Sequence, residues 1–338
     1  CRTPEQETWL PLMYDHTGID FRHLAFGQQV VEDVVHGTRH SQSLFLPSGR
    51  DDDQGPTTGQ RMRVYADEAG PLAIRAARQA LHQSRLAADE ITHLVTISCT
   101  GMQAPGVDFE LIEALALAPT VQRTHVGFMG CHGAINGLRI ARAFSDSDPE
   151  ARVLLCAVEL CSLHYHYGWD PQKMIANAIF ADGAAAVAGA ADPLDSAGVW
   201  RVTATGSCLI PDSREAMSWS IGDHGFEMTL SKRVPSLIRA HLRPWLESWL
   251  ARHGLRREAI GSWAIHPGGP RILEAIAQAL ELSDEQLAAA RAVFATHGNM
   301  SSPTVLFIVE HLRAQRAPLP CVALGFGPGL IAESALFE

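Results

Sequence analysis

The stretch Val126-Gly127-Phe128-Met129-Gly130-Cys131-His132-Gly133-Ala134 joins an apolar run to a helical one. Periodicity predicts a strand over 121–128 and a buried helix over 134–144. Gly130 permits a tight turn between them, so Cys131 stands at or near the start of the helix. A thiol there feels the partial positive charge of unpaired backbone N–H groups, which favours its thiolate. Taken alone, the stretch is equally typical of a buried structural cysteine.

Strands and helices alternate on both sides of this stretch. In the first half, strands are expected at 91–98, 121–128, 153–158 and 184–188, and helices at 61–83, 107–117 and 134–144. In the second half, strands are expected at 199–205, 261–265, 321–325 and 330–336, and helices at 234–252, 271–280 and 305–312. The alternation predicts an α/β fold with parallel sheets covered by helices. We expect two similar halves, 1–195 and 196–338, divided near 192–197 and packed as one body, and an irregular segment before residue 60.

Two segments of the second half can bring polar groups to the cysteine. The run 263–270, Trp-Ala-Ile-His-Pro-Gly-Gly-Pro, predicts a buried strand that ends in His266, and strand ends are where sites collect in α/β folds. In the run 297–304, Ser302-Pro303 predicts a helix start, and Asn299 lies in the loop before it. Viewed singly, His266 is more typical of a structural histidine and Asn299 of an ordinary turn residue.

Cysteine, histidine and asparagine form a coherent chemical set if they converge. Cys131 is then a nucleophile that holds an acyl group covalently, and His266 stabilises its thiolate. His266 and Asn299 can both donate hydrogen bonds to an oxygen on which negative charge develops. This chemistry requires no metal and no redox cofactor.

Composition narrows the class of protein. With 27 basic and 37 acidic residues the net charge is −10, which argues against a general binder of nucleic acid or anionic membranes. No apolar run approaches the roughly 18–20 residues of a membrane span. The seven cysteines are widely spaced and form no C-x-x-C pair, which favours free thiols in a reducing, cytoplasmic compartment. The run His164-Tyr165-His166 lacks a third metal ligand, and we expect no metal there. The chain starts at Cys1 without a methionine, so we expect the true N-terminus to be missing.

Four motifs together resemble the type III polyketide synthases, the chalcone and stilbene synthase-like family of the thiolase superfamily. The motifs are Gly130-Cys131, His266-Pro267-Gly268-Gly269-Pro270, Gly298-Asn299-Met300-Ser301-Ser302 and Gly325-Phe326-Gly327-Pro328-Gly329-Leu330. Other stretches are similar to its bacterial branch, namely 58–62, 98–101, 180–185 and 219–226. The resemblance begins near Arg61 and implies a homodimer with a layered αβαβα thiolase fold. It implies that the protein uses an acyl-CoA starter and malonyl-CoA directly, with no further cofactor. The expected reaction is a decarboxylative Claisen condensation followed by cyclisation to a pyrone, a resorcinol or a related aromatic.

The resemblance also assigns site residues. It makes Cys131 the nucleophile and His266 and Asn299 its catalytic partners. The residues expected to line the substrate pocket are Cys99, Thr100, Tyr165, Met228, Ser301 and Phe326, with Met228 at the gate and Tyr165 as a candidate second gate. We further expect Gly268, Gly269 and Arg271 to bind coenzyme A.

Three alternative classes of protein fit these residues less well. A carrier-protein-dependent ketoacyl synthase of the initiating type follows its histidine with Gln-Ala-Asn, whereas Pro-Gly-Gly-Pro follows His266. A papain-like protease also uses Cys, His and Asn, but it lacks the strand–helix duplication. A non-catalytic partner protein would have no need of all three groups.

The sequence leaves the acyl donor and the product open. No basic cluster matches the one that binds coenzyme A in plant members, although Arg39, Arg50, Arg61 and Arg63 are candidates, so an acyl carrier protein is an alternative donor. Because methionine is flexible, Met228 favours a fatty or medium-chain starter and an alkylpyrone or alkylresorcinol product. An aromatic product from malonyl-CoA alone, or from a phenylpropanoid starter, stays open.

Overall fold

A computed structural model describes residues 3–50, 52–191 and 198–338. The first half contains α1 (Pro4–Asp15), α2 (Gln28–His36), α3 (Thr58–Ser84), β1 (His93–Ser98), α4 (Val107–Leu115), β2 (Gln122–Gly127), α5 (Gly133–Ser147), β3 (Arg152–Leu160), α6 (Pro171–Ile179) and β4 (Asp182–Ala190). The second half contains β5 (Val202–Leu209), β6 (Met217–Gly222), β7 (Gly225–Leu230), α7 (Val234–Ala251), β8 (Ser262–Ile265), α8 (Pro270–Leu280), α9 (Ala288–His297), α10 (Pro303–Ala314), β9 (Cys321–Gly327) and β10 (Ile331–Phe337). Each strand and helix expected from periodicity has a counterpart here. The expected boundary at 192–197 lies outside the described residues, and the division into 1–195 and 196–338 stays a prediction.

The strands form two main sheets, in the orders β2-β1-β3-β4 and β5-β10-β9-β8, and a separate β6–β7 hairpin. In the first sheet β1 is parallel to β2 and β3, and β4 is antiparallel to β3. In the second, β8 is parallel to β9, whereas β10 is antiparallel to β9 and β5. The expectation of parallel sheets was therefore wrong in part. Only Pro328–Leu330 separate β9 from β10, and so short a connection can only turn the chain back.

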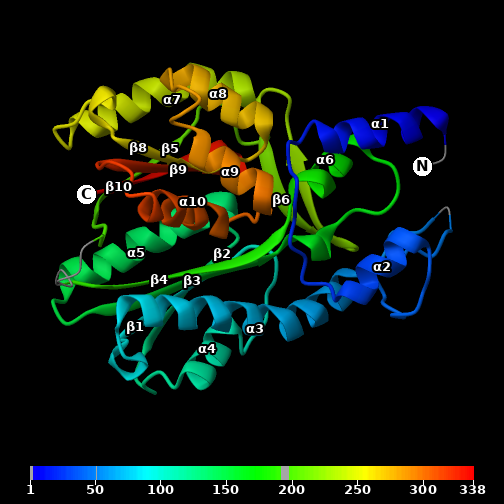
Figure 1. The fold of residues 1–338 in the computed structure, drawn as a ribbon, viewed down its shortest axis with the longest axis horizontal. Coiled ribbons are helices and arrows are strands. Elements are labelled where there is room, and N and C mark those ends of the chain that lie inside the picture. Colours follow the sequence, from blue (N-terminus) through cyan, green and yellow to red (C-terminus); the bar gives the residue numbers. More distant parts are fainter. Residues whose placement is uncertain (1–2, 51, 192–197) are drawn as a thin grey trace.

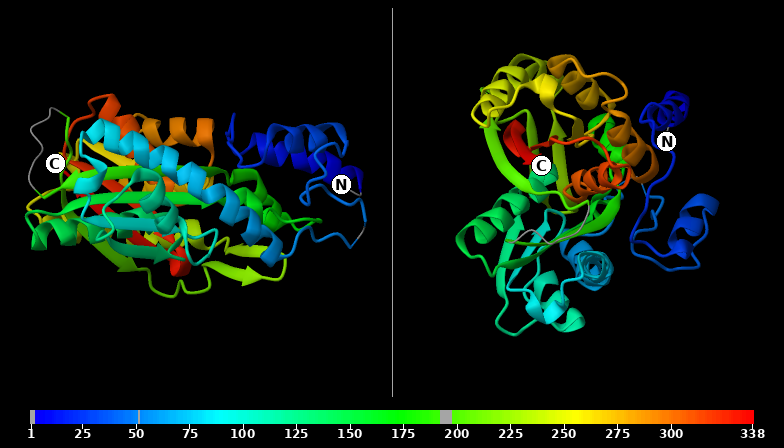
Figure 2. Two further views of the ribbon diagram at one scale, coloured as in Figure 1. Left: turned by 90° about the horizontal axis from the view of Figure 1, so that it is seen from below. Right: turned by 60° about the vertical axis from the view of Figure 1, so that its left-hand side comes forward.

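The elements stack in five layers, which confirms the predicted αβαβα architecture (Figures 1 and 2). Helices α3 and α4 cover the outer face of the first sheet, and α7 and α8 cover that of the second. Helices α5 and α10 lie between the sheets and contact both. Each of these two central helices begins beside the expected site, α5 just after Cys131 and α10 just after Asn299.

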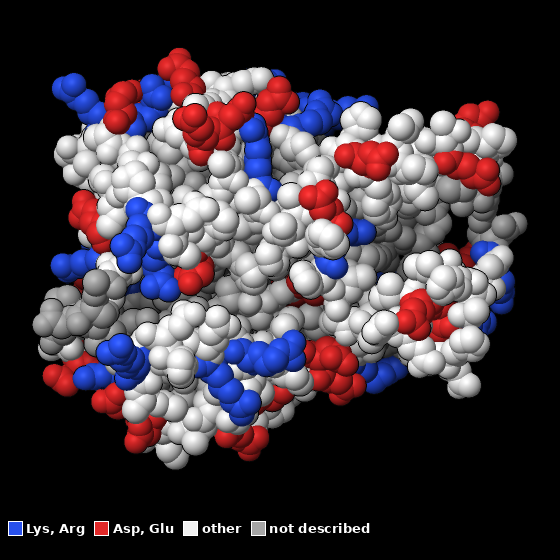
Figure 3. Space-filling model, viewed as in Figure 1, with Lys and Arg blue, Asp and Glu red and all other residues white. Residues whose placement is uncertain are grey.

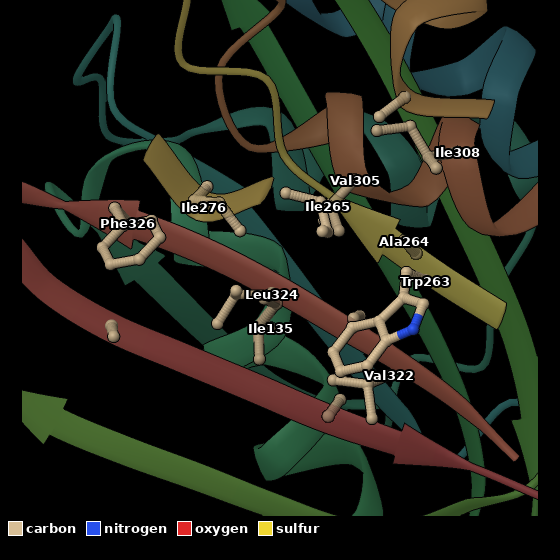
Figure 4. Packing of buried hydrophobic residues seen from close by; sticks show 14 of the residues in the cluster. Ile135, Trp263, Ala264, Ile265, Ile276, Val305, Ile308, Val322, Leu324 and Phe326 are labelled. Carbon is tan, nitrogen blue, oxygen red and sulfur yellow. The ribbon is translucent and has the colours of Figure 1, made fainter. Parts of the chain in front are cut away.

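The core around β8 and β9 fixes the backbone that leads into the site. Side chains from α5, α8 and α10 pack against both strands (Figure 4), and the labelled ones are Ile135, Trp263, Ala264, Ile265, Ile276, Val305, Ile308, Val322, Leu324 and Phe326. Trp263, Ala264 and Ile265 are buried. Because interiors are close-packed, the end of β8, and with it His266, has little freedom to shift.

The segment before residue 60 corrects a second expectation, because it contains α1 and α2. Thr3 caps α1 by accepting a hydrogen bond from the Gln6 amide, and a proline follows the cap. Helix α2 was not predicted, because its pattern of burial is the reverse of the usual one. Asp33 is its one buried residue, while Val34 and Val35 are exposed. The Asp33 carboxylate accepts hydrogen bonds from Thr38 and from the amides of His40 and Ser41, which stabilises the turn after α2.

Two further observations concern membranes and charged partners. No helix in the described ranges is long and apolar enough to cross a membrane. On the face shown in Figure 3, acidic and basic side chains of the described residues are interspersed.

Candidate active site

An open cavity lies where several strands reach their carboxyl ends, with about 640 Å³ of empty space that includes solvent at its mouth. Thr100 follows β1, Cys131 follows β2, Cys161 follows β3 and His266 follows β8. The lining residues are Cys99, Thr100, Gly130, Cys131, Cys161, Phe180, Met217, Ser218, Trp219, Met228, His266, Gly268, Ile272, Asn299, Ser301, Phe326 and Pro328. The cavity therefore brings together Cys131, His266 and Asn299, which are far apart in the sequence.

Cys131 lies in a short 3-10 turn, Gly130–His132, that continues directly into α5. Gly130 has a left-handed φ of 76°, and an added Cβ would lie 2.4 Å from the Pro328 ring, so a side chain would not fit. The Gly130 amide donates to the Cys99 sulfur at 3.0 Å, which holds the turn against the end of β1. Burial raises the pKa of the Cys131 thiol to about 11, although a hydrogen bond from Ser301 acts in the opposite direction. Burial therefore opposes the effect of the helix start, and a second group is needed to form the thiolate.

His266 is held by its backbone, while its ring is left without a polar partner. Its amide donates to the Leu324 carbonyl of β9 at 2.8 Å. Both ring nitrogens are buried and hydrogen-bond to no described residue. Burial, with a smaller contribution from nearby His132, lowers the pKa of His266 to about 3. A buried polar group without a partner costs free energy, and it is common where a ligand supplies the missing contact.

Asn299 is anchored so that its side-chain N–H groups stay available. Its backbone amide donates to the Ile179 carbonyl at 2.8 Å, and its carbonyl accepts from the Ala181 amide at 2.9 Å. The side-chain oxygen accepts from the Ser301 amide at 2.8 Å. Ser301 itself has a left-handed φ of 58°, which curls the loop back on the asparagine. The Asn299 amide nitrogen is thus left to donate toward Cys131 and the cavity, and a side-chain hydrogen bond with Asn299 acts to lower the pKa of Cys131.

Behind the cavity lies a carboxylate that the sequence reading missed, Glu159 at the end of β3. It is completely buried and accepts hydrogen bonds from the Cys99 amide at 2.8 Å, Thr100 Oγ1 at 2.7 Å and Ser302 Oγ at 2.6 Å. These bonds tie β1, β3 and the start of α10 together. Burial raises the pKa of Glu159 to about 7, although the hydrogen bonds oppose the rise. Nothing in the local sequence distinguishes this glutamate from a strand-end residue exposed to water.

Most of the expected pocket residues line the cavity, namely Cys99, Thr100, Met228, Ser301 and Phe326. Tyr165 is not among the described residues that line it. Its hydroxyl donates to the Phe180 carbonyl at 2.7 Å and accepts from Arg22 at 3.1 Å, so Phe180 provides the wall in its place. Cys161 also lines the cavity from the same segment.

The residues expected to bind coenzyme A are spread along the start of α8. Gly268 lines the cavity, whereas Gly269 and Arg271 do not belong to its described lining. Arg271 is exposed in the first turn of α8. Arg61, one of the other candidates, is fully buried and donates to the carbonyls of Pro56 and Leu163, so it has a structural role.

The β6–β7 hairpin supplies a wall that the sequence reading largely missed. Met217, Ser218 and Trp219 come from β6, and Trp219 pairs across the hairpin with Met228. The remaining unforeseen lining residues are Gly130, Cys161, Phe180, Ile272 and Pro328. A period-two reading of 217–221 against 226–230 could have found this wall, because Met217, Trp219, Phe226 and Met228 share one face.

The fold and the site together define a thiolase-fold acyltransferase. The body has five α/β layers, a cysteine precedes one central helix, an asparagine precedes the other, and a histidine follows β8. Residues 50–193 match the family model for the N-terminal domain of chalcone and stilbene synthases, and residues 201–338 match the model for their C-terminal domain. The chain belongs to this family and is a type III polyketide synthase. The ketoacyl synthase alternative is not supported.

Individual relatives agree with the family. The chain is 37% identical over 285 residues to the 1,3,6,8-tetrahydroxynaphthalene synthase of Streptomyces peucetius subsp. caesius, covering 83% of this chain and 76% of that protein. It is 33% identical over 289 residues to the alpha-pyrone synthesis polyketide synthase-like Pks18 of Mycobacterium tuberculosis, covering 83% and 74%. The solved structure of PKS-I from the brown alga Ectocarpus siliculosus superposes with a TM-score of 0.89 at 30% identity, covering 99% of this chain and 90% of that one.

Proposed function

We propose that Cys131, His266 and Asn299 catalyse the decarboxylative condensation of malonyl-CoA with an acyl group carried on Cys131. The observation that carries this proposal is the cavity in which a thiol, an unpartnered imidazole and a free amide donor meet. Each group matches one chemical need of the reaction: a nucleophile, a proton acceptor and a donor to an oxyanion.

Loading begins with the transfer of the Cys131 proton to His266. Each group alone is neutral at pH 7, because burial raises the pKa of the thiol and lowers that of the imidazole. Transfer within the pair leaves its net charge at zero, so burial opposes it less than it opposes either charge alone. The thiolate attacks the carbonyl of the acyl thioester, the tetrahedral intermediate collapses, and coenzyme A leaves as a thiol with the proton.

Extension begins when malonyl-CoA enters the same cavity. The bond from its methylene carbon to its carboxylate breaks, carbon dioxide leaves, and the electron pair forms an enolate on the thioester oxygen. An N–H of His266 and the amide of Asn299 donate hydrogen bonds to that oxygen. Each such donor lowers the activation barrier by roughly 3 kcal/mol. The carbanion then attacks the acyl-Cys131 carbonyl, and the Cys131 sulfur is the leaving group.

Coenzyme A thioesters are the proposed donors, with Gly268, Gly269 and Arg271 at the start of α8 as the groups that meet coenzyme A. Arg271 is exposed and provides a positive charge for a phosphate. Delivery by an acyl carrier protein is the alternative. We further propose that the enzyme acts as a homodimer in the cytoplasm and needs no additional cofactor.

The proposed starter is a fatty or medium-chain acyl group, cyclised to an alkylpyrone or alkylresorcinol. Met217, Trp219, Met228 and Phe180 make the cavity wall apolar, as an alkyl chain requires. The similarity to a protein named for alpha-pyrone synthesis supports this choice. The similarity to a tetrahydroxynaphthalene synthase favours the second candidate, an aromatic product from malonyl-CoA alone.

The test incubates the protein with labelled malonyl-CoA and a panel of acyl-CoA starters of graded chain length, and reads the products by mass spectrometry. Polyketides that vanish in Cys131→Ala, and a preferred alkyl starter, are the expected result. Products from malonyl-CoA alone would select the aromatic alternative. Neither decarboxylation nor extension with any starter would contradict direct use of coenzyme A thioesters.

A further inference from the structure

The β6–β7 hairpin is a separate two-stranded sheet, yet it forms a whole wall of the cavity. Trp219 and Met228 lie opposite each other on its two strands, and both line the cavity. An isolated hairpin is marginally stable in water, so its position depends on what it binds to. The shape of this wall is therefore set by the contacts that attach the hairpin to the rest of the molecule.

His164 provides one of these attachments. It is buried in the short turn after β3, and its ring stacks on Phe226 of β7 with centroids 4.1 Å apart and planes 11° from parallel. Its Nε2 lies 2.6 Å from the Thr100 carbonyl, and its Nδ1 lies 2.9 Å from the Phe226 amide. The imidazole thus links two parts of the cavity lining, the end of β1 and the hairpin.

The two partners fix the protonation of the ring. A carbonyl only accepts, so Nε2 carries the hydrogen and donates it to Thr100. An amide N–H only donates, so Nδ1 is the bare nitrogen that accepts from Phe226. Burial lowers the pKa of His164 to about 4, helped by the nearby positive charge of Arg61, which is consistent with this neutral form. With both nitrogens occupied, the ring has no lone pair left for a metal.

Trp219 is attached to the same segment by a second bond. Its indole N–H donates to the Cys99 carbonyl at 2.7 Å, one residue before the carbonyl to which His164 donates. The Trp219 ring meets His164 and Phe226 edge-on, at centroid distances of 5.7 and 5.8 Å. His164, Phe226 and Trp219 thus form one cluster, which we call the hairpin lock.

We propose that His164 is a positioning residue that holds Trp219 and Met228 at a fixed distance from the end of β1, and thereby limits the length of the acyl chain that the cavity accepts. This rests on the proposed function of the same cavity. Loss of the two bonds of His164 leaves the hairpin with fewer attachments, among them the Trp219–Cys99 bond and the bonds of its tip to Thr58. The wall can then shift outward, so a longer chain fits.

The experiment compares the wild type with His164→Phe, which keeps a ring to stack on Phe226 but loses both hydrogen bonds, and with His164→Asn, whose side-chain oxygen can still accept from the Phe226 amide. His166→Phe, two residues along, is the matched control. The first readout is the ratio of kcat/KM for dodecanoyl-CoA to that for hexanoyl-CoA, with malonyl-CoA as extender. Because it is a ratio, a partial loss of folded enzyme cancels. The second readout is hydrogen exchange of the peptide that contains Phe226, which requires no activity.

We expect His164→Phe to raise the ratio about tenfold, the equivalent of about 1.4 kcal/mol, since one or two neutral hydrogen bonds are lost. Its Phe226 amide should exchange faster than in the wild type. His164→Asn should show a smaller rise and near-normal exchange, and His166→Phe should match the wild type in both. An unchanged ratio in active His164→Phe overturns the proposal, whatever the exchange shows. If the wild type is inactive with every starter, the proposed function is contradicted instead. In that case the exchange readout still tests the hairpin lock, and unchanged exchange of the Phe226 amide in His164→Phe overturns it.

Discussion

At the scale of single residues, the site combines groups that burial keeps uncharged. The Cys131 thiol and the His266 imidazole both face a largely apolar cavity, and burial moves their pKa values to about 11 and about 3. In the proposed mechanism the pair acts together, because only an exchange of one proton between them produces a thiolate without adding net charge. Neither residue can be replaced without changing the behaviour of the other.

This coupling predicts how Cys131 responds to pH. In the wild type we expect alkylation of Cys131 by iodoacetamide to change little between pH 6 and 9, because His266 takes up the proton. In His266→Ala the thiol is left with the pKa of about 11 that burial imposes, so the rate at pH 7 should fall at least about 100-fold and rise about tenfold per pH unit. Mass spectrometry of the Cys131 peptide measures the rate. Identical pH profiles in the two proteins would contradict the coupling.

The Glu159 carboxyl predicts a pH dependence of stability. Its pKa rises from 4.5 in the unfolded chain to about 7 in the folded protein, so the folded state binds its proton more tightly. The resulting stabilisation of the folded state is fully present below pH 4.5 and is lost as the pH rises through 7. Its size is about 3 kcal/mol, because each unit of pKa difference corresponds to about 1.36 kcal/mol. In Glu159→Gln this contribution to the free energy of unfolding should disappear.

Urea denaturation at pH 5 and pH 8 tests this prediction, with Asp284→Asn, an exposed carboxylate, as the control. The difference in unfolding free energy between wild type and Glu159→Gln should change between the two pH values by about 2–3 kcal/mol. The control should change by less than about 0.5 kcal/mol. A difference that is the same at both pH values would show that Glu159 keeps an ordinary pKa in the fold.

At the scale of elements, the connection between β9 and β10 packs directly against the nucleophile turn. An added Cβ on Gly327 would lie 2.4 Å from His132 Nε2 and 2.6 Å from the Met129 carbonyl oxygen. Two residues on, Gly329 has a left-handed φ of 74° but no described atom within 4 Å of such a Cβ. The two glycines of one motif are therefore required for different reasons, close packing in one case and backbone conformation in the other.

Gly327 and Gly329 therefore predict different effects for the same substitution by alanine. Gly329→Ala should cost about 1 kcal/mol, the penalty of an alanine in the left-handed region, and should retain most of the activity. Gly327→Ala should cost about 3 kcal/mol or more and lower condensation strongly, because the Met129 backbone and Cys131 turn must move. Thermal unfolding and malonyl-CoA decarboxylation measure both effects. Equal losses in the two variants would contradict the distinction.

How far the elements could be predicted from the sequence follows from how regular each pattern is. Strands β1, β3, β8 and β9 are continuous apolar runs, and α7 has a clear amphipathic period, so these were found. Helix α2 was missed because its only buried residue is Asp33, and the β6–β7 hairpin because its alternation includes Ser218 and Ser220. The antiparallel pairing of β10 with β9 could have been inferred from the short connection between them. The antiparallel pairing of β4 with β3 could not, because it depends on where the longer chain through α6 returns.

At the scale of the whole molecule, the site exists only because both halves of the chain meet. Cys131 follows β2 of the first sheet, His266 follows β8 of the second, and Asn299 precedes α10 between the sheets. The sequence could name these three residues because their motifs are local. It could not show Glu159 or His164 as organising groups, because their roles lie in partners about 60 or more residues distant, such as Thr100 and Ser302.

The last prediction concerns the assembly of whole chains. Strand β2 is an edge of the first sheet, paired on one side with β1, and Gln122, Arg123 and His125 are mostly exposed along it. An edge strand presents unpaired N–H and C=O groups, which a second copy can satisfy. We therefore expect a homodimer of about 73 kDa, twice the mass of one 36.6 kDa chain, in which amides of 122–127 exchange slowly. Sedimentation equilibrium and hydrogen exchange across a dilution series measure both. A mass near 37 kDa at micromolar concentration would contradict the dimer, and a dimer with fast exchange in β2 would place its interface on another surface.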